Sequence, residues 1–571
     1  MNIAVLLVGV LAVFVIAYRV VGRFLERETQ MDAARPTPAH ASQDGVDFVP
    51  THPLILFGHH FSSIAGAGPI VGPIIAGLAF GWGPALLWVV VGAVLVGGIH
   101  DFTTLLASVR HRGETIGQVC KRYLDPLAYH ALLAFIWLAM IYVLIVFLDL
   151  TATSFAPESP KLLHEGGAVA TASVVYIGLA VLFGVAVYRW KLSLLTASVV
   201  FVPLVFVGMW VGHVWPWTAD QVPAWFGSAK NTWSVGLLGY CFLAAVLPVW
   251  VLLQPRDYLS SYLLVACLVG GAVGILVGGG SGSLPLEYPA FRGWRDAQLG
   301  YVFPALFITV ACGAMSGFHS IVASGTTSKQ LANERDARPV AYGGMLVEGV
   351  LAVVALAAVM VLAQAPAGQT PVAVFALGMG KFLGVFGINP QLATTFGLLA
   401  VSTFLLTTLD TCTRLGRFIV QEFFGLTGTV GRYVGTAATL AIPAVMVFVQ
   451  IEGPTGQPMP AWKAIWPAFG ATNQLLGALA LLVVYSWLRH AGRKTWYVFV
   501  PMVFMCGTTL TALTQLVYQN LLTPGGSRFI GGVSAVMGLL AVALLVNAGW
   551  RLRKLARQRA GVTPVAVTET A

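Results

Sequence analysis

Charged residues are scarce in this sequence. Only 9% of the 571 residues are Asp, Glu, Lys or Arg, against about 25% in a typical soluble domain. Hydrophobic residues make up 57% of the chain and occur in runs long enough to cross a bilayer. These features exclude a soluble globular protein and predict an all-α polytopic membrane protein whose surroundings are lipid.

Recognised catalytic motifs are also missing. The chain has no H-E-x-x-H zinc helix, no G-x-S-x-G elbow and no Walker loop, and its six cysteines form no C-x-x-C pair. We therefore predict that the protein is not an enzyme and has no catalytic residues, no cofactor and no metal site. Two alternatives stay open: a membrane redox protein whose histidines hold haem or a metal, and a transporter-like sensor.

A net charge of +10 does not indicate a nucleic-acid partner here. Most of the 32 Lys and Arg residues fall in every second loop between apolar runs, as the positive-inside rule describes. This bias predicts an outside N-terminus and a cytoplasmic C-terminus. No nucleic acid is expected to bind.

Windows of about 20 residues predict about 15 spans. They lie near 3–22, 57–80, 84–108, 130–150, 168–188, 193–214, 234–253, 259–280, 299–325, 343–365, 390–411, 433–450, 466–488, 496–515 and 529–550. The apolar segment 371–388 is ambiguous because it is glycine-rich and carries Lys381. If it crossed the membrane, every later basic loop would lie outside, so we predict a re-entrant or interfacial segment.

One predicted span is interrupted by glycine and proline, in Gly58-His-His-Phe-Ser-Ser-Ile-Ala-Gly-Ala-Gly-Pro-Ile-Val-Gly-Pro73. A helix broken at membrane depth exposes backbone groups that only protein or a wet cavity can satisfy. Pro69 suits the first position of a new half-helix, and the amides around Gly66 suit an anion such as a carboxylate. The alternative is a tight helix crossing that uses small residues for close packing.

A second stretch resembles the first. Phe61-Ser-Ser-Ile-Ala-Gly-Ala-Gly68 matches Phe318-His-Ser-Ile-Val-Ala-Ser-Gly325 at four positions, and the two spans run in opposite directions. The second break falls either at Gly313–Gly317 or at Ser324–Gly325. Opposed broken helices in two halves are typical of inverted-repeat transporters.

We therefore predict LeuT-like inverted five-helix repeats with peripheral helices. The expected divisions are an N-terminal anchor and linker (1–56), the first repeat (57–214), two intervening helices (215–298), the inverted second repeat (299–488), and two C-terminal helices with a basic tail (489–571).

Residues at or near the two breaks, together with an amide pair in a later span, are candidate substrate ligands. They are Ser63, Gly66, Ala67, Gly68, Ser316, His319, Ser320, Asn473 and Gln474. The amide pair Asn473–Gln474 has an equally plausible role as a hydrogen-bonded link between helices.

Ionisable groups inside spans are functional candidates by default. Those proposed to carry a coupling proton are His60, Asp101, Glu348 and Asp410. The alternative for the acids is a structural ion pair with Arg414, Arg110 or Lys329. Sodium coupling needs only oxygen ligands, which Gly66 with Ser402 and Thr403, or with Thr407 and Thr408, could provide.

Several long strings resemble the carbon starvation protein A (CstA) family of bacterial inner-membrane transporters. Besides Gly58–Pro73 they are His100-Asp-Phe102, Gln254-Pro-Arg-Asp-Tyr-Leu259, Asp336-Ala-Arg-Pro-Val-Ala-Tyr-Gly-Gly-Met-Leu-Val-Glu348, Leu409-Asp-Thr-Cys-Thr-Arg-Leu415 and Phe469-Gly-Ala-Thr-Asn-Gln474. The resemblance implies a LeuT-like fold, the bacterial inner membrane, and uptake of pyruvate with protons or of peptides. Cys412 stands where alanine is usual.

Together these observations predict a secondary active transporter that imports a small carboxylate, with pyruvate as the expected substrate, coupled to an inward proton gradient. Peptide uptake and sodium coupling remain the alternatives within this class.

Overall fold

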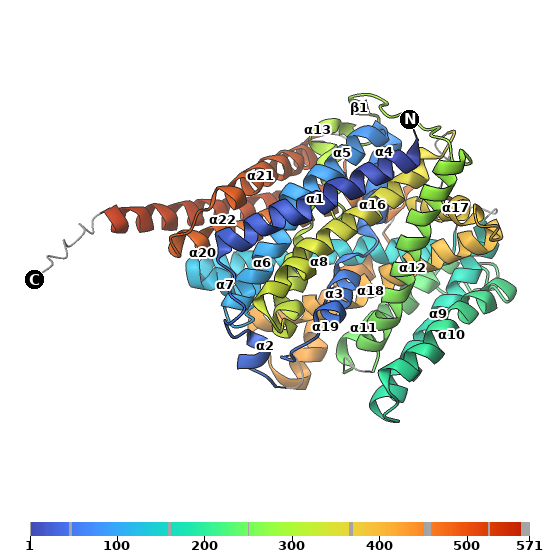
Figure 1. Ribbon diagram of the computed structural model, residues 1–571, viewed down its shortest axis with the longest axis horizontal. Coiled ribbons are helices and arrows are strands. Elements are labelled where there is room, and N and C mark those ends of the chain that lie inside the picture. The colour runs from blue at the N-terminus through green and yellow to red at the C-terminus, as the bar shows by residue number, and fades with distance from the viewer. Residues whose placement is uncertain are drawn as a thin grey trace, which may run out of the picture.

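The computed structural model describes residues 2–44, 48–157, 162–248, 251–364, 369–449, 451–452, 458–523 and 526–560. Its regular structure is almost entirely helical (Figure 1). The end of the predicted C-terminal tail, 561–571, lies outside the described residues.

The first half of the chain contains helices and one π-helical turn, η1. They are α1 (Ile3–Thr29), α2 (Pro38–Ala41), α3 (Pro53–Ile64), α4 (Gly68–Phe80), α5 (Trp82–Gly92), η1 (Ala93–Gly97), α6 (Gly98–Arg110), α7 (Ile116–Tyr123), α8 (Pro126–Phe155), α9 (Leu163–Tyr188), α10 (Leu194–Val214), α11 (Ala229–Val246) and α12 (Leu253–Ser281).

The second half adds two short antiparallel hairpins and further helices, of which η3, η5 and η6 are π-helical and η4 is a 3₁₀ turn. They are β1 (Arg295–Asp296), β2 (Gly300–Tyr301), α13 (Val302–Thr309), α14 (Gly317–Val322), η3 (Ala323–Thr327), α15 (Ser328–Gln330), η4 (Glu334–Asp336), η5 (Arg338–Gly343), α16 (Gly344–Met360), α17 (Pro371–Gly384), α18 (Pro390–Phe424), α19 (Gly428–Met446), β3 (Ile451–Glu452), β4 (Pro458–Met459), α20 (Ala461–His490), α21 (Trp496–Val517), η6 (Tyr518–Leu522) and α22 (Arg528–Ala560).

The all-α polytopic fold is confirmed, but the count of about 15 spans is not. Among the described residues, 11 helices are long and apolar enough to cross a membrane, or up to 12 if the bent pair α3–α4 is one span. Three predicted spans account for the difference: 234–253 became α11, 433–450 became α19, and 299–325 became α13 and α14 on either side of a break. The sequence windows detected apolar composition without seeing that these helices are short, more polar or interrupted.

The segment predicted to be re-entrant or interfacial forms α17. Its 14 residues rise about 21 Å, less than the roughly 30 Å of a hydrocarbon core. Lys381 near its end donates a hydrogen bond of 2.7 Å to the carbonyl of Val361, just beyond the end of α16. The membrane position of α17 stays a prediction, as do the boundaries of the two repeats.

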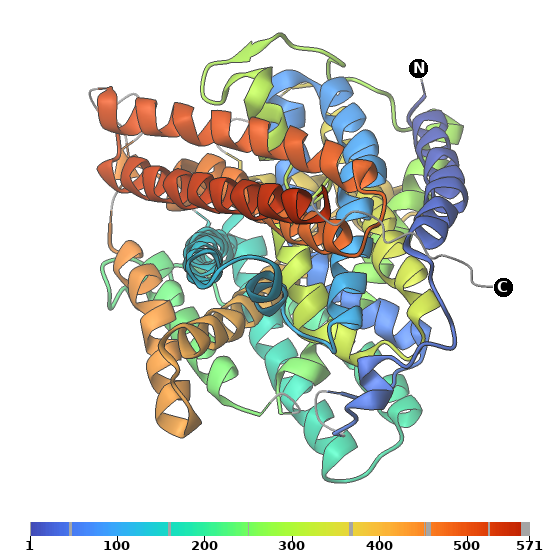
Figure 2. The same ribbon diagram turned by 90° about the vertical axis from the view of Figure 1, so that its left-hand side faces the viewer.

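Helix burial separates a centre from a periphery. In the most apolar 18-residue stretch of each helix, 94% of the residues of α20 and 89% of those of α18 are buried. The same share is only 28% for α1, 33% for α22 and 22% for α10. Figure 1 shows α21 and α22 at one side of the molecule and α9 and α10 at the other, and Figure 2 views the side covered by α21 and α22. The most buried helices are therefore where a shared site can be shielded from lipid.

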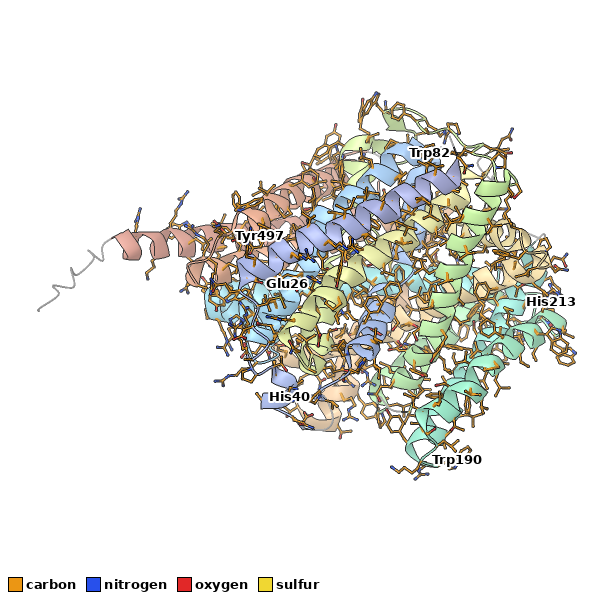
Figure 3. The ribbon with its side chains drawn as sticks, viewed as in Figure 1. Glu26, His40, Trp82, Trp190, His213 and Tyr497 are labelled. Atoms are coloured by element: carbon orange, nitrogen blue, oxygen red, sulfur yellow. The ribbon has the colours of Figure 1, made fainter. Side chains whose placement is uncertain are left out.

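Successive helix ends lie on two opposite faces. In Figure 3, Trp82 and His213 lie toward one face, and His40 and Trp190 toward the other. Trp82 begins α5 and His40 belongs to α2, so the described chain passes between these faces as a polytopic protein does. Which face is cytoplasmic stays a prediction.

Close approach between α4 and the chain after α13 depends on Gly72. A Cβ at this position would lie 2.5 Å from the carbonyl oxygen of Thr309, so a larger residue has no room without a backbone shift. Gly178 in α9 offers a matched control, because a Cβ there meets nothing within 4 Å.

We expect Gly72→Ala to destabilise the protein by about 1–3 kcal/mol through overpacking. Gly178→Ala should be neutral or slightly stabilising because alanine favours helix. Thermal unfolding of the two purified variants, followed by fluorescence-detected size exclusion, measures the difference. Equal melting temperatures would show that the Gly72 contact is not tight in solution.

Candidate functional site

The first helix break lies between α3 and α4. The two helices meet at 47°, and Ala65 leaves the helical region with φ −78° and ψ 61°. The amide of Gly66 donates to the carbonyl of Ile64 at 2.8 Å, whereas the amides of Ala67 and Gly68 donate no hydrogen bond among the described residues. The new helix begins at Gly68, one residue before the predicted start at Pro69. These free amides lie at its positive N-terminus.

The second break lies between α13 and α14, at residues 310–316. This decides between the two locations left open by the sequence, because Gly313–Gly317 falls at the break and Ser324–Gly325 falls inside the π-helical turn η3. The polypeptide leaves helical geometry after Thr309 and returns to it at Gly317.

The two breaks face one another. A Cβ on Gly68 would lie 2.3 Å from the Sγ of Cys312, and one on Gly313 would lie 3.6 Å from the Cα of Pro69. Glycine at 68 therefore lets the start of α4 contact the middle of the second break. The expected meeting of two interrupted helices is present in the structure.

The side chains of Asn473 and Gln474, on α20, bind both ends of the second break. Asn473 Oδ1 accepts from the amide of Phe318 at 3.1 Å, and its Nδ2 donates to Ser316 Oγ at 3.0 Å. Gln474 Nε2 donates to the carbonyls of Phe307 at 2.5 Å and Val310 at 3.3 Å. The pair thus supplies the bonds that an uninterrupted helix would make for itself.

Three ionisable side chains meet beside this break, and we call them the His319 cluster: Asp101 of α6, His319 of α14 and Glu348 of α16. His319 Nδ1 lies 2.8 Å from Asp101 Oδ2, and its Nε2 lies 3.3 Å from Glu348 Oε2. All three are completely buried. The other Asp101 oxygen contacts Nδ1 of His100, also buried, at 2.7 Å.

The contact between His319 and Glu348 requires a proton. With Asp101 ionised, His319 Nδ1 donates to its carboxylate, since an ionised carboxylate can only accept. Nε2 then either carries a second proton toward Glu348 or faces a protonated Glu348. Without that proton an imidazole lone pair would face a carboxylate at 3.3 Å, in an apolar interior where such repulsion is strong. The two groups are at ion-pair distance but are not aligned as a hydrogen bond.

Further buried polar atoms lie near the cluster. His60 of α3 contacts Thr327 Oγ1 through Nδ1 at 2.9 Å, and its ring lies against Gly344, one turn before Glu348. His60 Nε2, His100 Nε2 and Glu348 Oε1 have no hydrogen-bond partner among the described residues. Unsatisfied buried groups are costly and are typical of functional sites.

Each helix that contributes to the His319 cluster adjoins a π-helical turn. Turn η1 leads directly into α6, η3 follows α14, and η5 leads into α16. Single π-helical turns are rare and occur frequently at functional sites. The sequence analysis missed this feature, which has no simple residue pattern.

Asp410 was predicted as a proton carrier or as a partner of Arg414, Arg110 or Lys329, and those partners are wrong. Asp410 Oδ2 pairs with Nη1 of Arg256 and accepts from the hydroxyl of Tyr240 at 2.9 Å. Arg110 instead pairs with Glu334. Arg256 lies buried in the first turn of α12, which places its guanidinium inside the bundle.

The remaining predicted ligands are placed as follows. Ser63 and Ser320 donate to carbonyls of their own helices, at 2.8 and 2.7 Å. Of the residues considered for sodium, Ser402 Oγ lies 3.2 Å from Ser173 Oγ, and Thr403 bonds within its helix. Among these residues, Thr408 approaches Gly66. A Cβ built on Gly66 would lie 2.5 Å from the hydroxyl oxygen of Thr408.

The family model described as "Carbon starvation protein CstA" matches residues 2–369 and 364–512. The "Peptide transporter CstA" of Bacillus subtilis (strain 168) is 31% identical and the alignment covers 96% of each chain. The "Peptide transporter CstA" of Escherichia coli (strain K12) is 32% identical over 90% of this chain and 81% of the relative. The "Pyruvate/proton symporter BtsT" of Escherichia coli (strain K12) is 31% identical over 89% of this chain and 81% of the relative.

Among solved structures, a manganese transporter of Eremococcus coleocola in complex with an aromatic bis-isothiourea compound is 14% identical with a TM-score of 0.39, covering 90% of this chain and 99% of the other. MhsT in complex with L-phenylalanine is 13% identical with a TM-score of 0.33, covering 79% and 98%. Scores this low carry no argument about fold or function.

We expect Asn473→Leu to destabilise the protein by about 1–3 kcal/mol, because it leaves the buried amide of Phe318 without an acceptor. Ser486→Ala is the matched control: Ser486 is buried in the same helix but bonds only to Leu482 of that helix. Thermal unfolding measures stability, and hydrogen exchange of 317–322 reports the α14 amides directly. If both variants behave like the parent, Asn473 does not stabilise the break.

Proposed function

This chain belongs to the carbon starvation protein CstA family, and we propose that it imports a small monocarboxylate, in the first place pyruvate, together with a proton. The family and its named relatives are transporters, so the protein is a membrane transporter and not an enzyme. The single observation that supports proton coupling is the proton-dependent contact between His319 and Glu348.

A carboxylate fits the first break. The amides of Ala67 and Gly68 are free and lie at the N-terminus of α4, a helix of 13 residues whose dipole favours an anion there. A peptide would also present a positively charged amine. Asp101 and Glu348 both already contact His319, so binding of that amine by either acid would compete with the imidazole for its charge.

Substrate and proton are linked through α14. The second break ends at Ser316, and His319 is the third residue of the helix that follows. A shift of α14 as substrate enters between the breaks would therefore move His319 relative to Asp101 and Glu348. Because the contact with Glu348 holds a proton, that movement changes the affinity for the proton, and the linkage is reciprocal.

The two units are proposed to rock about this site, as inverted-repeat transporters do. The proposed location is the bacterial inner membrane with the N-terminus outside and the C-terminus in the cytoplasm. This orientation puts Glu334 and Arg110 on the cytoplasmic side.

Peptide import is the second candidate, favoured by the names of several relatives at 31–33% identity. Uptake of labelled pyruvate and of a labelled dipeptide into proteoliposomes, with pH and sodium gradients imposed separately, distinguishes the candidates. Accumulation of pyruvate driven by the pH gradient alone is expected. Accumulation of the dipeptide but not pyruvate would replace the proposed substrate, and dependence on sodium alone would replace the proposed ion.

We expect Glu348→Gln to lower gradient-driven pyruvate accumulation at least tenfold, because glutamine keeps the size of the side chain but cannot release a proton. Exchange of internal for external pyruvate should continue, since it needs no net proton movement. Glu287→Gln, an identical change at an exposed position outside the cluster, should leave both activities intact. Normal accumulation by Glu348→Gln would remove Glu348 from the coupling mechanism.

A further inference from the structure

Three arginines from two helices meet at the C-terminal end of α11. They are Arg414 and Arg417 of α18 and Arg432 of α19, and we call them the α11 cap. Their guanidinium groups donate to four consecutive backbone carbonyls, those of Ala244, Ala245, Val246 and Leu247. Gly435, three residues after Arg432, also packs on Arg417, because a Cβ there would lie 3.1 Å from Arg417 Cγ. The three positive charges therefore converge on one helix end.

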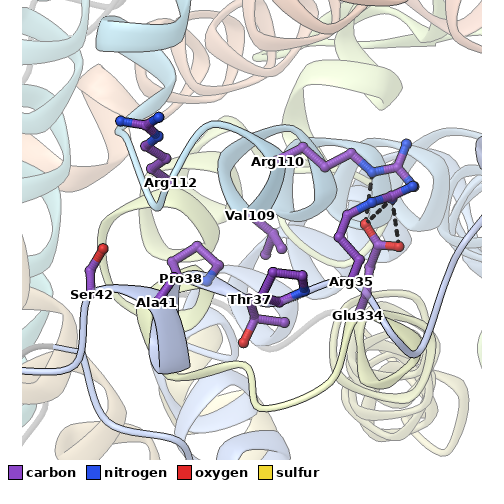
Figure 4. A pocket seen from close by; sticks show the side chains of 10 residues that line it. Arg35, Thr37, Pro38, Ala41, Ser42, Val109, Arg110, Arg112 and Glu334 are labelled. Atoms are coloured by element: carbon purple, nitrogen blue, oxygen red, sulfur yellow. Dashed lines mark hydrogen bonds and ion pairs between the residues drawn. The ribbon is translucent and has the colours of Figure 1, made fainter.

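The charge of the α11 cap is not balanced by carboxylates. Among the described residues neither Arg417 nor Arg432 forms an ion pair, and the carbonyls that they bind are neutral. Glu422, which follows Arg417 on α18, accepts instead from the hydroxyl of Tyr129 at 2.5 Å. The pocket in Figure 4 shows the contrast, since its Glu334 is paired with Arg35 and Arg110. At the α11 cap, only the partial negative charge of a helix C-terminus offsets the arginines.

The α11 cap lies where lipid head groups are expected. At 1.5 Å per residue, Arg417 lies about 40 Å from the start of α18 at Pro390, beyond the roughly 30 Å of a hydrocarbon core. Helices α11 and α19 pack side by side in Figure 1. Gln254, at the start of the next helix after α11, accepts at 2.9 Å from the hydroxyl of Tyr188, two residues before Trp190. The cap therefore belongs to the face of Trp190, which we predict to be cytoplasmic.

Exposed apolar side chains adjoin the cap. Tyr433 and Val434 directly follow Arg432 in α19 and are 49% and 48% exposed. Phe418 is 48% exposed, and the centre of its ring lies 4.3 Å from the guanidinium carbon of Arg417. In a membrane-spanning bundle such side chains face acyl chains, and aromatic ones are enriched at the level of the head groups. The cap thus joins a cluster of positive charge to a lipid-facing surface.

We propose that the α11 cap binds the phosphate of an anionic phospholipid. Arg432 is exposed and Arg414 partly exposed, so these two contact the phosphate, and the buried Arg417 adds its charge. Guanidinium groups form charge-assisted hydrogen bonds with phosphate, and basic clusters between helices on the cytoplasmic side are typical of head-group sites. A zwitterionic lipid has the same phosphate but also an ammonium group, which the cap repels. The site therefore prefers a lipid with net negative charge.

A lipid at this position links three helices. Its head group contacts arginines of α18 and α19 that also hold the end of α11. Helices α11 and α18 meet again inside the bundle, where the hydroxyl of Tyr240 donates to Asp410 at 2.9 Å. Because like charges held together repel one another, the anion lowers the energy of the folded arrangement. A ligand that binds only the folded protein raises its stability.

Native mass spectrometry of the purified full-length protein, titrated separately with phosphatidylglycerol and phosphatidylcholine, tests the preference. The anionic lipid should bind about fivefold more tightly or better, and Arg432→Gln should remove most of this difference. Arg432 is exposed, so the variant should fold, and Arg432→Lys, which keeps the charge, should retain much of the preference. Arg335→Gln is the matched control, because Arg335 is an exposed arginine of η4 outside the cap.

Hydrogen exchange in nanodiscs then locates the lipid. Amides of residues 428–436 should exchange more slowly with phosphatidylglycerol than with phosphatidylcholine in the parent protein, and equally with both lipids in Arg432→Gln. Equal affinity for the two lipids, equal losses in Arg432→Gln and Arg335→Gln, or no lipid-dependent protection of 428–436 would overturn the proposal. Neither measurement involves pyruvate, so the lipid site and the proposed transport activity stand or fall separately.

Discussion

The proton that we propose between His319 and Glu348, in the interior of a membrane-spanning bundle, is the constraint on which the rest of this account depends. An ionised group at membrane depth is tolerated only where partners compensate it, and here two carboxylates from two helices compensate one imidazole from a third. Removing the proton leaves a lone pair against a carboxylate. The contact therefore has a different energy in each protonation state, which ion coupling requires.

The two helix breaks bear on this constraint because the second break contacts the start of α4, where the free amides lie, and leads directly into α14 with His319. Gly68 and Gly72 allow α4 to contact the chain between α13 and α14, and Asn473 with Gln474 satisfies the ends of that second break. The interruption is thus stabilised from α20, one of the most buried helices. His319 follows the break by three residues, so α14 connects the second break, beside the proposed anion site, to the proposed proton site.

The sequence identified much of this site because broken helices and buried charges are visible as residue types. Gly66, Asp101, His319 and Glu348 were all singled out from glycine-proline patterns and from the cost of charge in lipid. Their pairing was not predictable: contacts across helices depend on rotation and depth, and Asp410 was consequently given wrong partners instead of Arg256. The count of about 15 spans was not confirmed because hydropathy windows cannot tell a span from two fragments separated by a break, as at α13 and α14, or from a shorter, more polar helix such as α11 or α19.

Substrate-dependent proton uptake by the purified protein tests the central claim most directly. In weakly buffered detergent solution containing a pH indicator, at a pH high enough that the substrate-free cluster has lost its proton, adding pyruvate should remove close to one proton per protein from solution, and Glu348→Gln should remove none. This measurement needs no membrane, gradient or assumption about direction. Proton uptake that persists unchanged in the Glu348→Gln variant, or pyruvate binding with no proton taken up, would contradict the account.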